Sequence, residues 1–164
     1  MLEGVLVTGG LDSDQETLDR VFMRMALKEA VAAFRAGEVP VGAVVVAGGR
    51  VLCSAHNLCE SRCDPTAHAE ILALRAACRA IGNYRLTGAW VYVSVEPCVM
   101  CAGALHWARV ERVVYGCSDP KAGAMGSMYT IHSDGRLNHR LQVRGGVLGE
   151  ECGRLMRAFF KRLR

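Results

Sequence analysis

Two short motifs carry residue types that can do metal chemistry. The first is His68-Ala69-Glu70, and the second, about 30 residues later, is Pro97-Cys98-Val99-Met100-Cys101. An imidazole and two thiolates are three good ligands for a tetrahedral zinc ion. The two cysteines are three residues apart, so on a helix they lie on one face. Three protein ligands leave the fourth position open to water, which is typical of a catalytic zinc site.

Both motifs fall where a helix is expected to begin. A helix N-terminus carries partial positive charge and free N–H groups, which favour a thiolate over a thiol. Pro97 is tolerated there because its missing N–H would have no partner within the helix. Bound zinc can bring the pKa of water toward ~7. Glu70, two residues after His68, is then placed to carry a proton from that water to a substrate without binding the metal.

Each motif has a simpler interpretation when it is taken alone. His68 by itself would be an ordinary capping or core histidine, and the two cysteines by themselves would be half of a four-cysteine structural site. The other cysteines offer no second C-x-x-C, because Cys59 and Cys63 form a C-x-x-x-C and Cys117 and Cys152 are single. The pair of motifs, their order and their helix-start context therefore favour a catalytic zinc site.

The apolar periodicity predicts the elements that position these motifs. A capping box at residues 13–16 starts the first helix, and a Gly-Gly turn at 48–49 joins two β-rich runs into a hairpin. The expected strands are 40–46, 50–56, 90–95, 110–115 and a short one at 141–144. The expected helices are 14–36, one that starts after 64–66 and ends at 82–83, one from 96–97 to 108, and one from 149 to the end. Residues 117–139 are expected to form a long loop that can include a short helical turn.

This order of elements predicts an α/β fold. Helices and strands alternate after the hairpin, which implies a mixed sheet of about five strands with helices on both faces. In such sheets, functional sites form where helices begin beyond the strand ends, and both motifs lie at such junctions. We expect one domain over residues 16–164. Residues 1–15 are expected to be an acidic, loosely ordered N-terminal extension.

Composition excludes several classes of protein. Of the 164 residues, 51% are hydrophobic and 22% are charged, which excludes a disordered chain. Apolar runs stay well short of the ~18 residues that a membrane helix needs. The N-terminus has no basic segment of the kind that starts a signal peptide, so we expect a cytoplasmic protein without membrane contact, whose eight cysteines do not form a disulfide scaffold.

Positive charge is concentrated after the first helix has begun. The first 19 residues hold five acids and no base, so residues 20–164 carry 20 basic against 11 acidic side chains, a net +9. Nearly all of this charge is arginine, which favours a polyanionic partner such as a nucleic acid. The last helix contributes Arg154, Arg157, Lys161, Arg162 and Arg164 around Phe159 and Phe160. These charges either bind phosphates or form a solvated face, with at least one phenylalanine in the core.

The pattern H-x-E…P-C-x-x-C resembles that of zinc-dependent nucleoside and nucleobase deaminases. Within that superfamily the chain resembles the bacterial tRNA-specific adenosine deaminases over roughly residues 16–164. The matching stretches are Val39–Val44, Asp64–Glu70, Asn83–Leu86, Glu96–Ala104 and Asp119–Ala124. The most specific of them are Val-Met-Cys-Ala-Gly-Ala at 99–104 and Asp-Pro-Lys-Ala-Gly-Ala at 119–124.

The resemblance implies a three-layer α/β/α cytidine-deaminase-like fold and hydrolytic deamination of adenosine to inosine at the wobble position of a tRNA. The tRNA would be an arginine tRNA with an A-C-G anticodon, bound through its anticodon stem-loop, and the enzyme would be a homodimer with one zinc ion per subunit. In family terms, His68, Cys98 and Cys101 bind zinc and Glu70 is the catalytic proton shuttle. The substrate-binding positions are Asn57, Ala69, Asp119 and Lys121.

Two other functions stay open on the sequence. The superfamily signature is shared with deaminases of free bases such as guanine or cytosine, although the arginine-rich surface and the stretch at 99–104 argue against them. A non-catalytic, zinc-stabilised RNA-binding module would also contain the three ligands. In that case Glu70 would be incidental, and its replacement would leave function intact.

Overall fold

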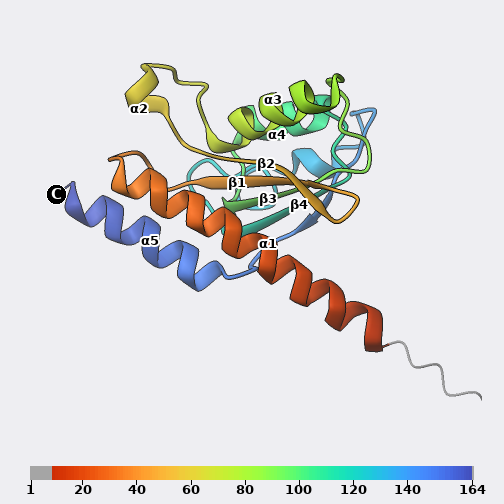
Figure 1. Cartoon of the computed structure of the whole chain (residues 1–164), viewed down its shortest axis with the longest axis horizontal. Coiled ribbons are helices and arrows are strands. Elements are labelled where there is room, and N and C mark those ends of the chain that lie inside the picture. Colours follow the sequence, from red (N-terminus) through yellow and green to blue (C-terminus); the bar gives the residue numbers. More distant parts are fainter. Residues whose placement is uncertain (1–8, 164) are drawn as a thin grey trace, which may run out of the picture.

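A five-stranded mixed sheet forms the centre of the molecule, with the strand order β2-β1-β3-β4-β5 (Figure 1). The structure is a computed structural model and describes residues 9–163. The strands are β1 (Gly42–Ala47), β2 (Arg50–His56), β3 (Trp90–Val95), β4 (Arg112–Cys117) and β5 (Gln142–Arg144). β1 is antiparallel to both β2 and β3, whereas β3, β4 and β5 are parallel.

Helices cover both faces of this sheet. They are α1 (Gly9–Arg35), α2 (Cys59–Arg62), α3 (Ala69–Ile81), α4 (Val99–Trp107), the short 3-10 helix η1 (Ile131–Ser133) and α5 (Gly149–Arg162). Figure 1 shows α1 and α5 on one side of the sheet and α3 and α4 on the other. The expected three-layer α/β/α arrangement and the mixed five-stranded sheet are therefore confirmed.

Alternation along the central strands builds a core on each side of the sheet. On β1, Ala43 and Val45 point into the cluster beneath α3 and α4, while Val44 and Val46 point into the cluster beneath α1. This period of two is what a strand buried on both faces produces. At the start of β1, Gly42 leaves no room for a side chain, because a Cβ there would lie 2.1 Å from the carbonyl oxygen of Ala26 on α1.

The expected elements differ from the observed ones in several places, among them the starts of β1 at Gly42 rather than 40 and of α4 at Val99 rather than 96–97. α1 begins at Gly9, so residues 9–15, expected to be loosely ordered, form its first turns, and the rest of that predicted extension lies outside the described residues. No proline interrupts this stretch, so the helical hydrogen-bond ladder continues N-terminal to the capping box. β4 starts at Arg112 rather than at 110. The single-turn helix α2 was not predicted, because one turn is too short to show a period.

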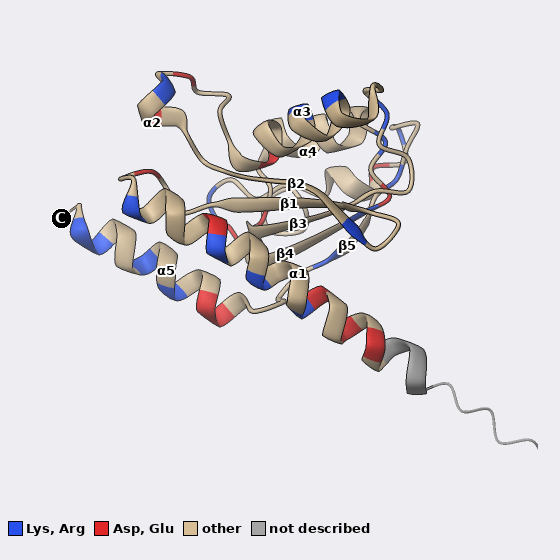
Figure 2. Ribbon diagram, viewed as in Figure 1, with Lys and Arg blue, Asp and Glu red and all other residues tan. Residues whose placement is uncertain are grey.

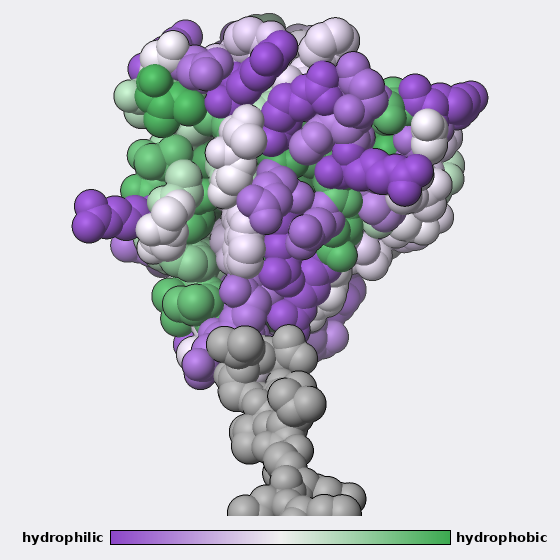
Figure 3. Space-filling view, turned by 90° about the vertical axis from the view of Figure 1, so that its right-hand side faces the viewer, coloured by the Kyte–Doolittle hydropathy of each residue, from purple (hydrophilic) through white to green (hydrophobic). Residues whose placement is uncertain are grey.

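None of the helices in the described part of the chain is both long and apolar enough to cross a membrane. Figure 3 views one end of the molecule, where hydrophilic side chains occupy most of the centre and hydrophobic ones gather toward one edge.

Candidate active site and metal centre

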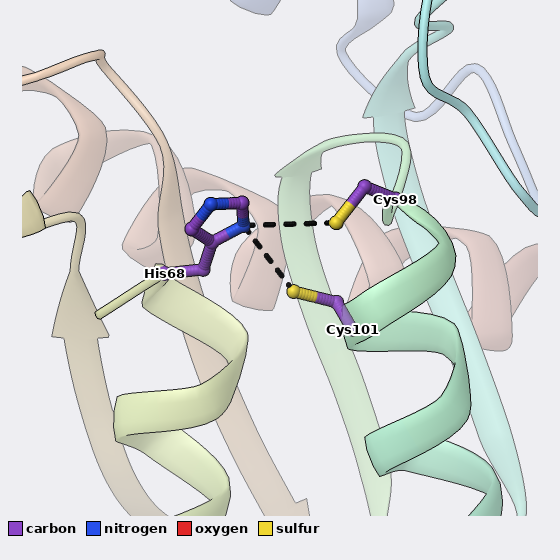
Figure 4. A group of neighbouring side chains, drawn as sticks. All are labelled: His68, Cys98 and Cys101. Carbon is purple, nitrogen blue, oxygen red and sulfur yellow. Dashed lines mark hydrogen bonds between the residues drawn. The ribbon is translucent and has the colours of Figure 1, made fainter. Parts of the chain in front are cut away.

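The two motifs meet at the N-termini of α3 and α4. His68 is the N-cap of α3, Cys98 is the N-cap of α4, and Cys101 lies in the first turn of α4. Figure 4 shows the three side chains converging from these two helix starts. The Nδ1 atom of His68 lies 3.7 Å from the Sγ of Cys98 and 3.5 Å from the Sγ of Cys101, and all three ligand atoms lie within 4.8 Å of one another.

This spacing fits a single tetrahedral metal ion. A nitrogen ligand at about 2.1 Å and a sulfur ligand at about 2.3 Å from one tetrahedral zinc are separated by about 3.6 Å. The two observed nitrogen–sulfur distances bracket that value. His68 and Cys98 are half-buried and Cys101 is buried, so the ligand atoms are partly shielded from solvent. These three residues are therefore a group that can hold a metal ion.

The charge state of the cluster favours a cation. Hydrogen bonds from the Cys101 thiol and from His68 outweigh burial and lower the pKa of Cys98 to about 4. The same hydrogen bond and burial raise the pKa of Cys101, whose proton is shared with the Cys98 thiolate. A hydrogen bond to Cys98 raises the pKa of His68. One thiolate is thus present at neutral pH, and a metal would displace the remaining protons.

Glu70 lies beside this cluster, and one of its carboxyl oxygens has no hydrogen-bond partner. The residue is 3% exposed, and its Oε2 atom is buried without a hydrogen-bond partner. Burial raises the pKa of Glu70 to about 7. A buried carboxyl oxygen without a partner is costly unless a ligand or water completes it. A carboxyl group with this pKa can both accept and release a proton near neutral pH.

An open groove of about 1540 Å³ leads to the cluster. Most of the predicted site residues line it, namely Asn57, His68, Glu70, Cys98, Asp119 and Lys121. Cys101 lies behind them, fully buried. Ala69 is the exception among the predicted substrate contacts, because its side chain packs into the core beneath α3 and α4. It directly follows the N-cap of α3, at a position that faces the sheet, so only its backbone is left for a substrate.

Asn57 is held by an acidic residue that the sequence did not single out. Glu38 is only 1% exposed, and its Oε2 accepts hydrogen bonds from the side-chain Nδ2 of Asn57 and from the backbone N–H of Glu60, both at 3.1 Å. Its Oε1 accepts from the backbone N–H and the hydroxyl of Ser61, at 2.8 and 2.6 Å. The available signal was an acid between Gly37 and the apolar run at 39–46.

Glu96 is a second buried carboxylate that holds a segment beside the groove, which it also lines. Its carboxylate accepts hydrogen bonds from the backbone N–H groups of Asp119 (3.0 Å), Met125 (3.0 Å) and Ser127 (2.9 Å), and from the Ser127 hydroxyl. Sequence reasoning also passed over this residue. Although burial opposes ionisation, these hydrogen bonds lower the pKa of Glu96 below its ordinary value. A buried carboxylate therefore fixes the loop that carries Asp119 and Lys121.

The basic helix α5 forms one rim of the groove, which is lined by Arg157, Phe160 and Lys161 among others. Figure 2 shows blue basic residues repeated along α5 toward the C-terminal end. Phe159 is buried and packs edge-on against Phe34, with ring centroids 6.0 Å apart, whereas Phe160 is half-exposed. The expectation that at least one of these phenylalanines belongs to the core is confirmed.

Comparison with known proteins agrees with this site. A family model described as MafB19-like deaminase matches residues 18–164. The tRNA-specific adenosine deaminase of Bacillus subtilis (strain 168) is 49% identical over 148 residues, which are 90% of this chain and 92% of that protein. Its counterpart in Haemophilus influenzae is 47% identical over 147 residues, 89% of this chain and 85% of that protein.

Two solved structures are also similar. One, from a study of A-to-I editing by tRNA:A34 deaminases at the wobble position of transfer RNA, is 44% identical with a TM-score of 0.80. It covers 82% of this chain and 98% of its own. The other is a guanine deaminase from Bacillus subtilis, which is 38% identical with a TM-score of 0.59 and covers 65% of this chain and 69% of its own.

Fold, site and family model together define the class of protein as a deaminase with the cytidine-deaminase-like α/β fold. Within that class, the chain belongs to the family of tRNA-specific adenosine deaminases.

Proposed function

We propose that this protein hydrolyses the wobble adenosine of a tRNA to inosine, and that its substrate is an arginine tRNA with an A-C-G anticodon. The observation that carries the proposal is the buried, unpartnered Oε2 of Glu70 beside three metal-ligand atoms, within a groove open to solvent. A cluster that only stabilised the fold would have no use for an open groove and an unpaired carboxyl oxygen.

His68, Cys98 and Cys101 would hold one zinc ion per subunit. Zinc, when bound, supplies a Lewis acid that makes hydroxide available from water near neutral pH. Glu70 takes the proton released from that water and transfers it to N1 of adenine while C6 is attacked. Glu70 would then take the remaining proton from the C6 hydroxyl and deliver it to the exocyclic amine, so the C6–N bond breaks, ammonia leaves and the C6 carbonyl forms. Its raised pKa suits a group that must accept and release a proton in each turnover.

The walls of the groove would bind the extruded nucleotide and its neighbours. Asn57 offers an amide to the base, Asp119 and Lys121 approach the flanking nucleotides, and Ala69 contributes its backbone. Basic side chains on α5 lie at the rim, where backbone phosphates would pass. Bases in an anticodon loop are not held in a duplex, so extrusion of one of them is less costly than extrusion from a double helix.

The test is formation of inosine. The zinc-loaded protein should convert the wobble adenosine of an A-C-G anticodon stem-loop to inosine, and it should release no ammonia from free guanine or cytosine. The guanine arm matters because a guanine deaminase is among the similar structures. Ammonia from a free base together with an unmodified stem-loop would replace our proposal with the free-base alternative.

Metal content tests the ligand assignment independently of activity. We expect about one zinc per chain in the purified protein and a loss of zinc in Cys98→Ala, because two remaining ligands bind zinc weakly. Cys117→Ala is the matched control, since Cys117 is also a half-buried, free cysteine that lines the groove. Equal zinc in both variants would refute the assignment.

We also propose that residues 16–164 form the single deaminase domain and that two copies form a homodimer in the cytoplasm. The family model covers nearly the same range as the proposed domain. Exposed apolar side chains on or beside α3 and α4, which include Ile81, Tyr84 and Trp107, offer a surface for a second copy. All eight cysteines are free, as in a protein of a reducing compartment.

A further inference from the structure

We propose that Glu38 is a positioning residue that sets which end of the Asn57 amide faces the substrate. This inference rests on the proposed function for its kinetic consequence, but the geometry that carries it is independent of the substrate. Glu38 is nearly inaccessible to solvent, does not line the groove and cannot touch a substrate, so any influence on the reaction must pass through the groups it binds.

An ionised carboxylate only accepts hydrogen bonds, whereas an amide both donates and accepts. The Oε2 of Glu38 lies 3.1 Å from the Nδ2 of Asn57, so the amino end of the amide must face Glu38. A flipped amide would place its carbonyl oxygen against the carboxylate, which is repulsive. An asparagine amide has two orientations that differ by a 180° flip, which exchanges its oxygen and nitrogen. Glu38 therefore excludes one of these two orientations of the Asn57 side chain.

The other interactions of Asn57 agree with this orientation. Its Oδ1 accepts from the Cys59 thiol at 3.5 Å, and its backbone N–H donates to the carbonyl of Val41 at 3.0 Å. Asn57 is 5% exposed and lines the groove, so its remaining hydrogen-bonding capacity is directed there. That capacity is one N–H of Nδ2 and one lone pair of Oδ1, arranged in a fixed order.

To recognise one base by its hydrogen-bonding edge, the Asn57 amide must present its donor and its acceptor in a fixed order. The edge of adenine that carries N7 and N6 presents an acceptor beside a donor, and an asparagine amide can pair with both at once. The same edge of guanine presents two acceptors. An amide free to flip would match either base less selectively, and it would hold the reacting carbon less accurately.

Glu38 is itself held in place from both sides. α1 ends in a left-handed turn at Gly37 (φ 79°), and the backbone N–H of Glu38 donates to the carbonyl of Ala33 at 2.9 Å. Three further donors, the backbone N–H groups of Glu60 and Ser61 and the Ser61 hydroxyl, come from α2. Although burial opposes ionisation, these hydrogen bonds and the one from Asn57 lower the pKa of Glu38, so it is a carboxylate at neutral pH.

A double-mutant cycle tests the inference. Glu38→Gln keeps the shape, and its one oxygen can still accept from the N–H and hydroxyl of Ser61. Its NH2 group then takes the place of Oε2, where it can donate to Oδ1 of a flipped Asn57 amide, but the N–H of Glu60 loses its acceptor. We expect kcat on the anticodon stem-loop to fall by about tenfold to a hundredfold, with a smaller change in KM, because phosphate contacts dominate stem-loop binding. Zinc content should be unchanged.

The decisive comparison is with Asn57→Ala. If Glu38 acts through Asn57, the double variant Glu38→Gln/Asn57→Ala should stay within about twofold of Asn57→Ala alone, since the two losses share one cause. Asp19→Asn is the matched control. Asp19 is a fully buried carboxylate that accepts from Tyr92, Gln15, Arg112 and Arg144 on the α1 side of the sheet. Its loss should multiply with that of Asn57→Ala.

A second readout does not depend on activity. The side-chain amide resonances of Asn57, assigned by their absence in Asn57→Ala, should shift in Glu38→Gln and stay near their wild-type positions in Asp19→Asn. If Glu38→Gln does not fold, Glu38→Asp takes its place in both measurements, and as the conservative variant it should otherwise recover part of the lost kcat.

The outcomes separate the two claims. A wild-type protein that makes no inosine contradicts the proposed function, and the resonances then decide the role of Glu38 alone. An active wild-type protein in which the effects of Glu38→Gln and Asn57→Ala multiply would overturn the inference while leaving the proposed function standing. Unchanged Asn57 resonances in Glu38→Gln would overturn it as well.

Discussion

The proposed role of Glu70 rests on its place beside the three candidate metal ligands and on its buried Oε2, which has no hydrogen-bond partner. A carboxylate on the surface of the groove would be hydrated and fully ionised at neutral pH, and it would be a poor proton donor. Burial changes that, because the charged form loses its water and the pKa rises to about 7. Glu70 interacts electrostatically with His68 and Cys98, so the proposed proton carrier and the candidate metal ligands lie together.

Replacement of Glu70 by glutamine tests this role. Glu70→Gln keeps the size but replaces the carboxyl group with an amide that cannot gain or release a proton near neutral pH, so kcat should fall by ~10²-fold or more. Zinc content and stem-loop affinity should stay close to wild type. Glu151→Gln is the control, since Glu151 is also a first-turn glutamate, on α5, and does not line the groove. An unchanged kcat in Glu70→Gln would refute the proton-shuttle role of Glu70, whereas a wild-type protein that binds the stem-loop without forming inosine would favour the non-catalytic RNA-binding alternative.

Two segments beside the groove, the short helix α2 and the loop after β4, are each held by hydrogen bonds to a buried carboxylate. Glu38 accepts from α2, and Glu96 accepts from three backbone N–H groups of the loop that follows β4. Backbone N–H groups that no helix or strand satisfies are thereby paired. This explains how segments without regular structure can hold Asp119 and Lys121 in fixed places.

The loop after β4 is packed too closely to accept a side chain at Gly123. A Cβ there would lie 2.4 Å from the Cδ of Glu96 and 2.5 Å from the carbonyl oxygen of Asp119. We expect Gly123→Ala to destabilise the protein by about 1–3 kcal/mol, because the loop must move away from Glu96. Gly103→Ala is the contrasting variant. Gly103 lies inside α4 with open space around it, so alanine should stabilise by about 0.5–1 kcal/mol. Thermal denaturation measures both.

Helix α5 supplies a basic rim whose contribution depends on salt. If Lys161 contacts a phosphate, Lys161→Ala should weaken stem-loop binding and reduce the slope of log K against log salt by about 0.7–0.9. Arg24→Ala removes an exposed charge from α1 that does not line the groove, and it should leave the slope unchanged. Equal slopes for both variants and the wild type would assign Lys161 to a merely solvated face.

At the scale of the whole molecule, stability is linked to pH through buried carboxylates. Hydrogen bonds outweigh burial and lower the folded-state pKa values of Glu38 and Glu96 below their ordinary value of 4.5. A lowered folded-state pKa gives stability that is fully present above the unfolded-state pKa and is lost as the pH falls through the folded-state value.

We therefore expect the stability that Glu38 and Glu96 contribute to be constant above about pH 5 and to be lost as the pH falls below it. Glu96→Gln should lower the melting temperature at neutral pH and make it less sensitive to acid. Calorimetry from pH 3 to 7 on both proteins checks this. An acid dependence as steep in Glu96→Gln as in the wild type would show that other groups cause it.

Assembly is the second property at this scale. Trp107 is 71% exposed at the end of α4, beside an apolar depression that Ile71 and Leu74 also line. A tryptophan this exposed is typical of an interface anchor. Trp107→Glu should give a monomer by light scattering at concentrations where the wild type is a dimer. Met25→Glu places the same charge on exposed α1, across the sheet, and should remain dimeric. A monomeric wild type would end the dimer proposal.

The sequence alone determined the local features of this protein. The metal-ligand set, the helix starts that hold it, the five strands and the four long helices follow from residue type and periodicity, because those properties act over a few residues. The family resemblance supplied the proposed substrate-binding positions, and the composition indicated a polyanionic partner.

Only the tertiary structure decided which side chains are buried and which side chains, distant in the sequence, lie in contact. It brought His68 within 3.7 Å of both cysteine sulfurs, left Oε2 of Glu70 without a partner, and turned the side chain of Ala69 into the core. It also showed that Glu38 and Glu96 hold the segments beside the groove through hydrogen bonds, although no local sequence pattern predicts that role for either residue. Burial and long-range hydrogen bonding depend on packing between segments far apart in the chain, and no spacing of residues along one segment encodes that.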